Sequence, residues 1–326
     1  MKSSNIGGQA VLEGVMMKNK DAYAVAVRKP DGEIEIKTDI HQSVVGKFRA
    51  LTRIPFIRGI FNFVDSLVLG MRTINWSASF YEEEEEKKEV TAEEAEREKK
   101  RDDLMMAATM VVSFALAIGI FMVLPYFLSD FLKKWIPSYT IRLIVEGIVR
   151  ITIFVGYVAG ISLMSDIRRL YCYHGAEHKC INCIEHGLPL TVENVRKSSK
   201  EHKRCGTSFM LFVMIVGIVL LFFVRVKTMW MRVLVRIALL PLIAGISYEL
   251  IKWAGNSDNP IVCILSKPGL WLQGLTTKEP DDSMIEVGIA SVEAVFDWKA
   301  YLRENFGYQD TDEAADRHSE GADGRK

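Results

Sequence analysis

Apolar residues along the chain gather into four long runs with charged stretches between them. The runs cover residues 104–128, 141–164, 207–224 and 233–253. Each is close to the roughly 20 residues that an α-helix needs to cross the hydrocarbon core of a bilayer. The pattern predicts a mainly α membrane protein, with a four-helix transmembrane domain over residues 104–253 and the lipid bilayer as a partner.

The first 42 residues follow a different pattern, in which apolar and polar positions alternate. Residues 22–28 and 33–38 alternate around a Pro-Asp-Gly turn, which predicts a β-hairpin. Residues 1–42 are therefore expected to form a small β-rich cytoplasmic unit. Glycines stand on both sides of Glu13, and they predict either a tight turn before a buried strand or a turn that brings Glu13 near a ligand.

The segments on either side of the spans are amphipathic or charged. Residues 43–80 interleave apolar and basic positions, which predicts one or two amphipathic helices in the membrane interface. Residues 81–103 are nearly all charged and predict a solvated linker, while residues 309–326 have a disordered composition. Residues 254–308 are expected to form a C-terminal cytoplasmic segment with a capped helix over 280–296.

Lysine and arginine are concentrated before the first span and in the loop 165–206, whereas the segments 129–140 and 225–232 hold few. The positive-inside rule then places both termini and this loop in the cytoplasm. Most of the cysteines lie in or beside the same loop, which favours a reducing compartment. The formal net charge of zero gives no argument for nucleic-acid binding.

Charges inside the spans are costly and must be explained. Glu146 and Arg150 lie in the second span, and Arg236 lies at a similar depth in the fourth. We expect these side chains to neutralise one another in a structural cluster. The spans offer no clear polar pathway, so transport is a weaker hypothesis.

The most informative motif is H-x-x-E-H at His174, Glu177 and His178. Residues i, i+3 and i+4 share one face of a helix, so both imidazoles and the carboxylate would point the same way. This is the order of the inverted zincin motif, in which the histidines bind zinc and the glutamate acts as general base. The motif predicts a divalent metal, zinc above others, with Glu177 as the catalytic residue.

Further ligands are expected on the same cytoplasmic cap, by which we mean the loop 165–206 and the C-terminal segment. His202 and Cys205 are of the types that zinc prefers, while Glu193 and Glu249 are candidate supporting acceptors. No glycine or proline interrupts residues 165–186, so the second span is expected to continue into the cap. The histidines would then stand roughly 15 to 20 Å beyond the membrane exit, out of reach of Glu249.

Two alternatives use the same residues. Cys180 and Cys183 form C-x-x-C, and with His202 and Cys205 they approximate a closed zinc ribbon that performs no chemistry. A C-x-x-C within a continuous helix suits such a site poorly, and it would leave H-x-x-E-H unexplained. The histidine pair could also serve only packing and hydrogen bonding.

Four segments together resemble a known family: residues 7–17, 173–179, 190–195 and 204–209. They are similar to the YqhQ-like family (domain of unknown function 1385), bacterial multi-pass membrane proteins labelled predicted metal-dependent enzymes. The resemblance covers nearly the whole chain outside the acidic linker and the tail. It implies a bacterial inner (plasma) membrane location.

Two classes of function follow. The first is a membrane-bound metal-dependent hydrolase acting on a peptide, amide or ester at the cytoplasmic membrane surface. The second is a non-enzymatic scaffold or accessory factor, for example one that assists insertion or assembly of other membrane proteins at a translocon. In the second class the amphipathic segment and the cap would dock membrane-protein partners, and any metal would be structural.

Overall fold

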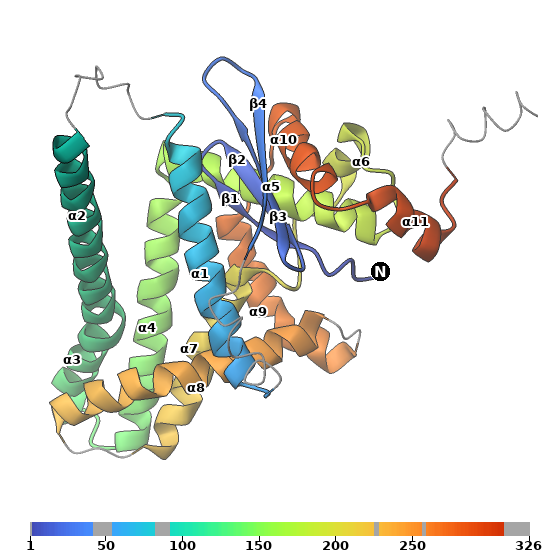
Figure 1. Ribbon diagram of the computed structural model, residues 1–326. Coiled ribbons are helices and arrows are strands. Elements are labelled where there is room, and N and C mark those ends of the chain that lie inside the picture. The colour runs from blue at the N-terminus through green and yellow to red at the C-terminus, as the bar shows by residue number, and fades with distance from the viewer. Residues whose placement is uncertain (1, 42–53, 82–91, 225–227, 256–258, 310–326) are drawn as a thin grey trace, which may run out of the picture.

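The computed structural model describes residues 2–41, 54–81, 92–224, 228–255 and 259–309 (Figure 1). It is mostly helical, with a small antiparallel sheet near the N-terminus and four helices long and apolar enough to cross a membrane. The expectations for residues 42–53, for residues 82–91 of the charged linker and for the C-terminal tail from residue 310 lie outside the described ranges, whereas residues 92–103 of the linker are helical.

The predicted β-rich unit is a four-stranded meander in the order β1-β2-β3-β4. Its strands are β1 Gly7–Val11, β2 Gly14–Asn19, β3 Ala22–Arg28 and β4 Ile34–Ile40. The predicted hairpin is the β3–β4 pair, with Ala26 opposite Ile36. The helices α1 and α5 lie on opposite faces of this sheet, so both faces of its centre are buried.

The helix α1 spans Ile57–Ala78 as one unbroken element. Leu69 and Trp76 pack against the sheet, while Asn62 donates to the hydroxyl of Tyr248 at 2.7 Å. Val64 and Leu67 belong to an apolar stripe that stays exposed. The helix therefore joins the sheet to the spanning helices, and its placement in the membrane interface stays a prediction.

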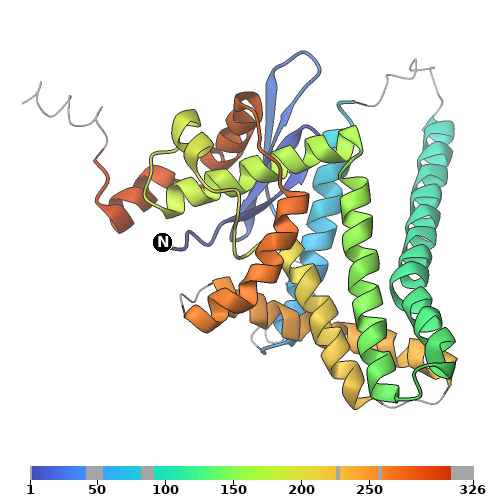
Figure 2. The same ribbon diagram turned by 180° about the vertical axis from the view of Figure 1, so that it is seen from behind.

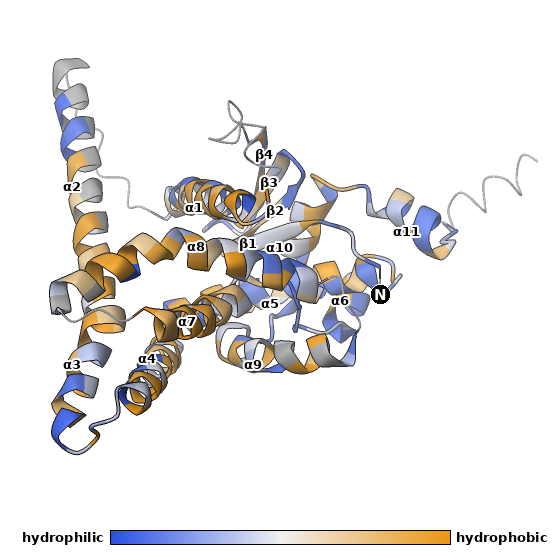
Figure 3. Cartoon of the chain, turned by 90° about the horizontal axis from the view of Figure 1, so that it is seen from below, coloured by the Kyte–Doolittle hydropathy of each residue, from blue (hydrophilic) through white to orange (hydrophobic). Residues whose placement is uncertain are grey.

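The candidate spans are Val111–Lys134, Tyr139–Ile161, Gly206–Phe223 and Val233–Gly255, which confirms the four predicted runs. The first of them combines the end of α2 (Ala92–Ile118), the π-helix Gly119–Val123, α3 (Leu124–Phe131) and the 3₁₀ turn Leu132–Lys134. The others are α4 (Tyr139–Ile161), α7 (Gly206–Phe223) and the end of α8 (Met229–Gly255). Figure 3 shows these helices as largely hydrophobic, whereas hydrophilic residues are frequent in the cap.

The expected charge cluster inside the spans is confirmed. Glu146 accepts hydrogen bonds from Arg150 at 2.9 Å and from Arg236. The two arginines also donate to the carbonyls of Phe121 and Met122, at 3.0 and 3.3 Å. Both carbonyls belong to the π-helix, a form in which the ordinary hydrogen-bond ladder is locally altered. One carboxylate and two carbonyls thus accept from both buried guanidinium groups, although Nε of Arg236 has no partner among the described residues.

The expectation that the second span continues into the cap was wrong. The helix α4 ends at Ile161, Met164 is extended with ψ 135°, and α5 (Ser165–Glu185) starts in a new direction and turns away from the axis of α4 (Figures 1 and 2). The cause is tertiary packing, because residues 175–185 are all buried against the sheet and α10. The helix α5 therefore lies across the bundle instead of rising away from it.

The C-terminal segment returns to the bundle and to the sheet. It comprises α9 (Pro260–Thr276), α10 (Asp282–Glu293) and α11 (Trp298–Phe306). The sequence left Asp281 and Asp282 as alternative N-caps of the predicted helix, and the structure shows Asp281, which accepts from the N–H of Met284 at 2.9 Å. The helix α9 was not expected, because Pro268-Gly269 and Gln273-Gly274 are typical of loops. Here they lie inside a helix that packs closely against α7.

Candidate metal centre

The helix α5 supplies the core of the site. His174, Glu177 and His178 share one face of it, as the helical period requires. Gly175 between them is needed for a different reason, since a Cβ there would lie 2.0 Å from the carbonyl oxygen of Lys278. The chain leaving α9 crosses α5 at this glycine, which brings the end of α9 to the histidines.

Both imidazoles are held by backbone carbonyls. Nδ1 of His174 lies 2.9 Å from the carbonyl oxygen of Thr276, and Nδ1 of His178 lies 2.6 Å from that of Lys200. A carbonyl oxygen can only accept a hydrogen bond, so each Nδ1 carries the proton and each Nε2 presents a lone pair. Metal-binding histidines are commonly fixed in this way by a partner behind the ring.

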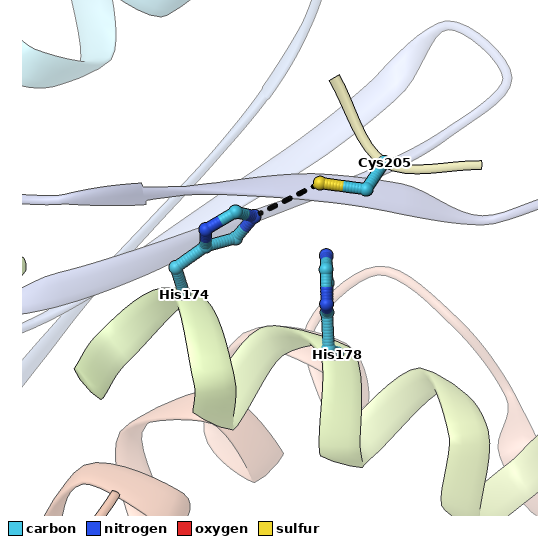
Figure 4. Close-up of side chains that lie close together, drawn as sticks. All are labelled: His174, His178 and Cys205. Carbon is cyan, nitrogen blue, oxygen red and sulfur yellow. Dashed lines mark hydrogen bonds between the residues drawn. The ribbon is translucent and has the colours of Figure 1, made fainter. Parts of the chain in front are cut away.

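Cys205 completes the group (Figure 4). Its Sγ lies 3.4 Å from Nε2 of His174 and accepts a hydrogen bond from the N–H of Thr207, also at 3.4 Å. The ligand atoms of His174, His178 and Cys205 all lie within 4.8 Å of one another. Because Cys205 is the N-cap residue of α7, the group lies at the end of a candidate span.

Glu177 lies directly beside this group. Its Oε2 is 3.8 Å from Nε2 of His174 and 3.7 Å from Nε2 of His178. Burial raises the pKa of Glu177 to about 7, and the nearby His174 and a hydrogen bond from the backbone N–H of Gly8 limit the rise. A carboxyl group with such a pKa can take up and release a proton near neutral pH.

His202 lies next to the group but faces away from it. Its ring centre is 5.6 Å from that of His178, and its Nε2 lies 3.7 Å from Oε2 of Glu185. Gln273 of α9 holds the backbone of His202 on both sides, accepting from its N–H at 3.0 Å and donating to its carbonyl at 2.8 Å. In the described part of the chain, the group of three ligands therefore forms with Cys205 and without His202.

Glu185 is the centre of a second cluster, which lies at the end of α5. It is fully buried and accepts hydrogen bonds from Arg204 and from the backbone N–H of Ser4, the latter at 2.8 Å. Burial alone would raise the pKa of Glu185, but His202, Arg204 and Ser4 together outweigh it and lower the pKa to about 2. This cluster fastens the N-terminal residues and the Arg204–Cys205 loop to the end of α5.

This cluster gives a testable pH dependence. A folded pKa below the ordinary value of 4.5 means that Glu185 stabilises the fold above about pH 4.5, and that this contribution fades as the pH falls toward 2. We expect Glu185→Gln to destabilise the protein by about 3 kcal/mol at pH 7, because Arg204 loses its buried partner. Thermal unfolding of both forms in detergent at pH 7 and pH 3 measures the difference. A stability difference between the parent and Glu185→Gln that is the same at both pH values would contradict the lowered pKa of Glu185.

The remaining sequence-predicted candidates lie away from the three ligands. Glu13, at the β1–β2 turn, binds Arg169 and accepts from the hydroxyl of Tyr173 at 3.1 Å. Glu193 is exposed and pairs with a lysine of its own helix α6 (Val192–Lys197) at 2.7 Å. Glu249 accepts from Nε of Arg58 on α1 at 2.6 Å.

The cysteines of the ribbon alternative point elsewhere as well. Cys180 and Cys183 are buried in the apolar cluster between α5 and α10, and a Cβ at Gly288 of α10 would lie 3.0 Å from the sulfur of Cys180. The sulfur of Cys183 is 3.4 Å from the carbonyl oxygen of Pro189. Among the described residues these two thiols do not join His202 and Cys205.

Sequence reasoning missed several residues that build the site. The carbonyls of Thr276 and Lys200 are backbone groups, and no sequence pattern reveals where they point. Gln273 could have been noticed, because it is a lone amide in an apolar segment and proves to be fully buried. Gly8, whose N–H reaches Glu177, stood in the glycine-rich segment but was not linked to the motif.

Comparison with known proteins agrees with the resemblance noted above. The model of the family "Protein of unknown function (DUF1385)" matches residues 54–298. This chain belongs to that family. It is 37% identical over 301 residues to the "Uncharacterized protein YqhQ" of Bacillus subtilis (strain 168), covering 92% of this chain and 94% of the relative. No solved structure matches. Neither description names an activity, so the enzyme label of the family is not supported by them.

Proposed function

We propose that this DUF1385 protein is a membrane-bound, metal-dependent hydrolase with its site at the cytoplasmic membrane surface. His174, His178 and Cys205 would hold one divalent ion, and zinc suits this donor set best. The observation that carries the proposal is the pair of carbonyl contacts behind the imidazoles, because they turn both Nε2 lone pairs toward the sulfur of Cys205.

The three ligands fit a catalytic site better than a structural one. Structural zinc sites use four protein ligands, whereas catalytic sites use three and keep one position open. In the described chain a fourth protein ligand is absent from the group, and the nearest further acid is Glu177. The side chain of His174 is 18% exposed, so the group is not sealed from solvent.

In the proposed reaction the three ligands would hold the ion and Glu177 would carry the proton. A bound zinc ion would polarise the scissile carbonyl and make water a stronger nucleophile at neutral pH. Glu177 would take a proton from the attacking water as its oxygen bonds to the carbonyl carbon. As the bond from that carbon to the amine or alcohol breaks, Glu177 would pass the proton to the leaving group.

The location of the site indicates that the substrate lies at the membrane surface. Cys205 caps a candidate span, so the reaction would take place at the end of the bundle and not in bulk cytosol. The lysine and arginine distribution supports a cytoplasmic position for this end, with both termini on the same side. A peptide, amide or ester at the membrane surface is the proposed substrate class.

Metal removal tests the proposal. Dialysis of the purified protein against a chelator should abolish hydrolysis of a fluorogenic peptide pool, and added zinc should restore it. The reason is that three ligands with an open position hold zinc reversibly. Unfolding should be followed in parallel, because a protein that loses activity only by unfolding would point to a structural ion. Hydrolysis that persists in metal-free protein would contradict the proposal.

A further inference from the structure

The outer edge of β1 is an open backbone surface. β1 is an end strand of the sheet, with β2 on one side only. Val11 and Gly14 flank a two-residue turn, so these two residues form a hydrogen-bonded pair between β1 and β2. Along an antiparallel pair of strands, every second residue of β1 bonds to β2 and the residues between them do not. Gly8 and Ala10 therefore turn their N–H and C=O groups outward. The next outward N–H, that of Leu12, donates to a serine of α1 at 3.1 Å, as this alternation requires.

This edge runs beside Glu177. The N–H of Gly8 donates to the Glu177 carboxylate, and a Cβ at Gly8 would lie 2.9 Å from Cγ of Glu177. Gly8 is itself exposed, so the strand edge is accessible where it meets the buried carboxylate. Within the described ranges, the carbonyl of Gly8 and the N–H of Ala10 have no partner on the outer side.

A pocket continues the same edge. A cavity of about 350 Å³ lies between α1 and the start of β1, lined by Gly7, Gly8 and Gln9. Lys18 and Lys20 also line it. The backbone edge thus leads from the proposed general base into a hollow with two amines. Extended peptides bind open sheet edges through their main chain and place alternate side chains in adjacent pockets.

We infer that the substrate is an extended polypeptide segment that adds to the sheet along the outer edge of β1. Its backbone would bond to the carbonyl of Gly8 and the N–H of Ala10, which places a peptide carbonyl beside Glu177. An acidic side chain or a C-terminal carboxylate would enter the pocket of Lys18 and Lys20. The inference rests on the proposed function for the cleavage step, but binding along β1 can be measured without turnover.

Proline variants test whether the peptide binds the β1 edge or the β4 edge of the sheet. Ala10→Pro removes the outward N–H of β1 and leaves the bonds to β2 intact, since proline is tolerated at outward positions of edge strands. Thr38→Pro is the matched control on β4, the other edge. On the β3–β4 pair, the backbone N–H of Lys29 donates to the carbonyl of Glu33 at 2.8 Å. Because hydrogen-bonded positions alternate along the pair, the N–H and C=O groups of Thr38 point outward, away from β3.

The probe is a fluorescein-labelled pool of random decapeptides, and the protein is the full-length Glu177→Gln chain in detergent. Fluorescence anisotropy should show binding that Ala10→Pro weakens about tenfold and Thr38→Pro changes less than twofold. A second pool, N-methylated at every amide, has no N–H left on either edge to pair with β1 and should bind about tenfold more weakly to the protein with the unmodified β1 edge. It tests the same pairing without altering the protein.

Several results would overturn the inference: no binding of the decapeptide pool, equal binding of the N-methylated pool, or equal loss in Ala10→Pro and Thr38→Pro. Thermal unfolding of each proline variant in detergent shows whether the fold is retained, independently of any bound metal. Failure of the proposed function looks different, because peptide binding along β1 would then persist in a protein that neither binds zinc nor cleaves peptides.

Discussion

Glu177→Gln is expected to keep its metal and to lose about a thousandfold in turnover. Glutamine has nearly the same shape as glutamate, so the packing around α5 should survive. It cannot take a proton from water, and a positioned general base contributes roughly 10²- to 10⁴-fold. Single-turnover hydrolysis of the peptide pool by purified protein, with metal content measured on the same sample, checks the prediction.

Glu193→Gln is the matched control for that experiment, since Glu193 is exposed on α6 and pairs only with a lysine of its own helix. It should leave turnover within about twofold, as surface ion pairs contribute little. A Glu177→Gln protein as active as the control would refute the role of Glu177 as base. If that variant also performs the full cellular role of the protein, the accessory-factor hypothesis becomes the better one.

The second large effect concerns metal binding. The double variant His174→Ala, His178→Ala removes both Nε2 ligands and should lower the bound zinc from about one ion per chain to below a tenth of that. Cys205→Ser should weaken binding as well, because a hydroxyl is a poorer zinc ligand than a thiolate. Elemental analysis after dialysis in zinc buffer measures each protein.

His186→Ala is the control for the histidine variants. His186 stands at the end of the same helix, and its Nδ1 bonds the carbonyl of Asn182 at 2.7 Å, outside the group of three ligands. It should bind as much zinc as the parent chain. Equal, negligible metal in the parent and the double variant would leave the histidine pair with a packing role only.

The parts of this structure that the sequence predicts are those governed by local periodicity. Four apolar runs give four candidate spans, and the Pro-Asp-Gly turn gives the β3–β4 hairpin. The face shared by His174, Glu177 and His178 follows from the helical period alone. Pairing of Glu146 with the two arginines follows from the cost of leaving buried charges unpaired.

What the sequence does not reveal depends on long-range packing. The direction of α5 is set by burial against β1, β2 and α10, so the absence of a helix breaker after Met164 was misleading. The choice of Cys205 over His202 depends on Gln273, a residue of a helix that was not expected. Glu249, read as a supporting acceptor, is instead occupied by Arg58 of α1.

Zinc K-edge X-ray absorption of the purified, zinc-loaded protein tests the proposed ligand set most directly. We expect one sulfur at about 2.3 Å, two imidazole nitrogens at about 2.0 to 2.1 Å, and one further light atom from solvent. The single sulfur distance should disappear in Cys205→Ser. A shell with three sulfurs, as in the ribbon alternative, or a shell without imidazole would contradict the site built on His174, His178 and Cys205.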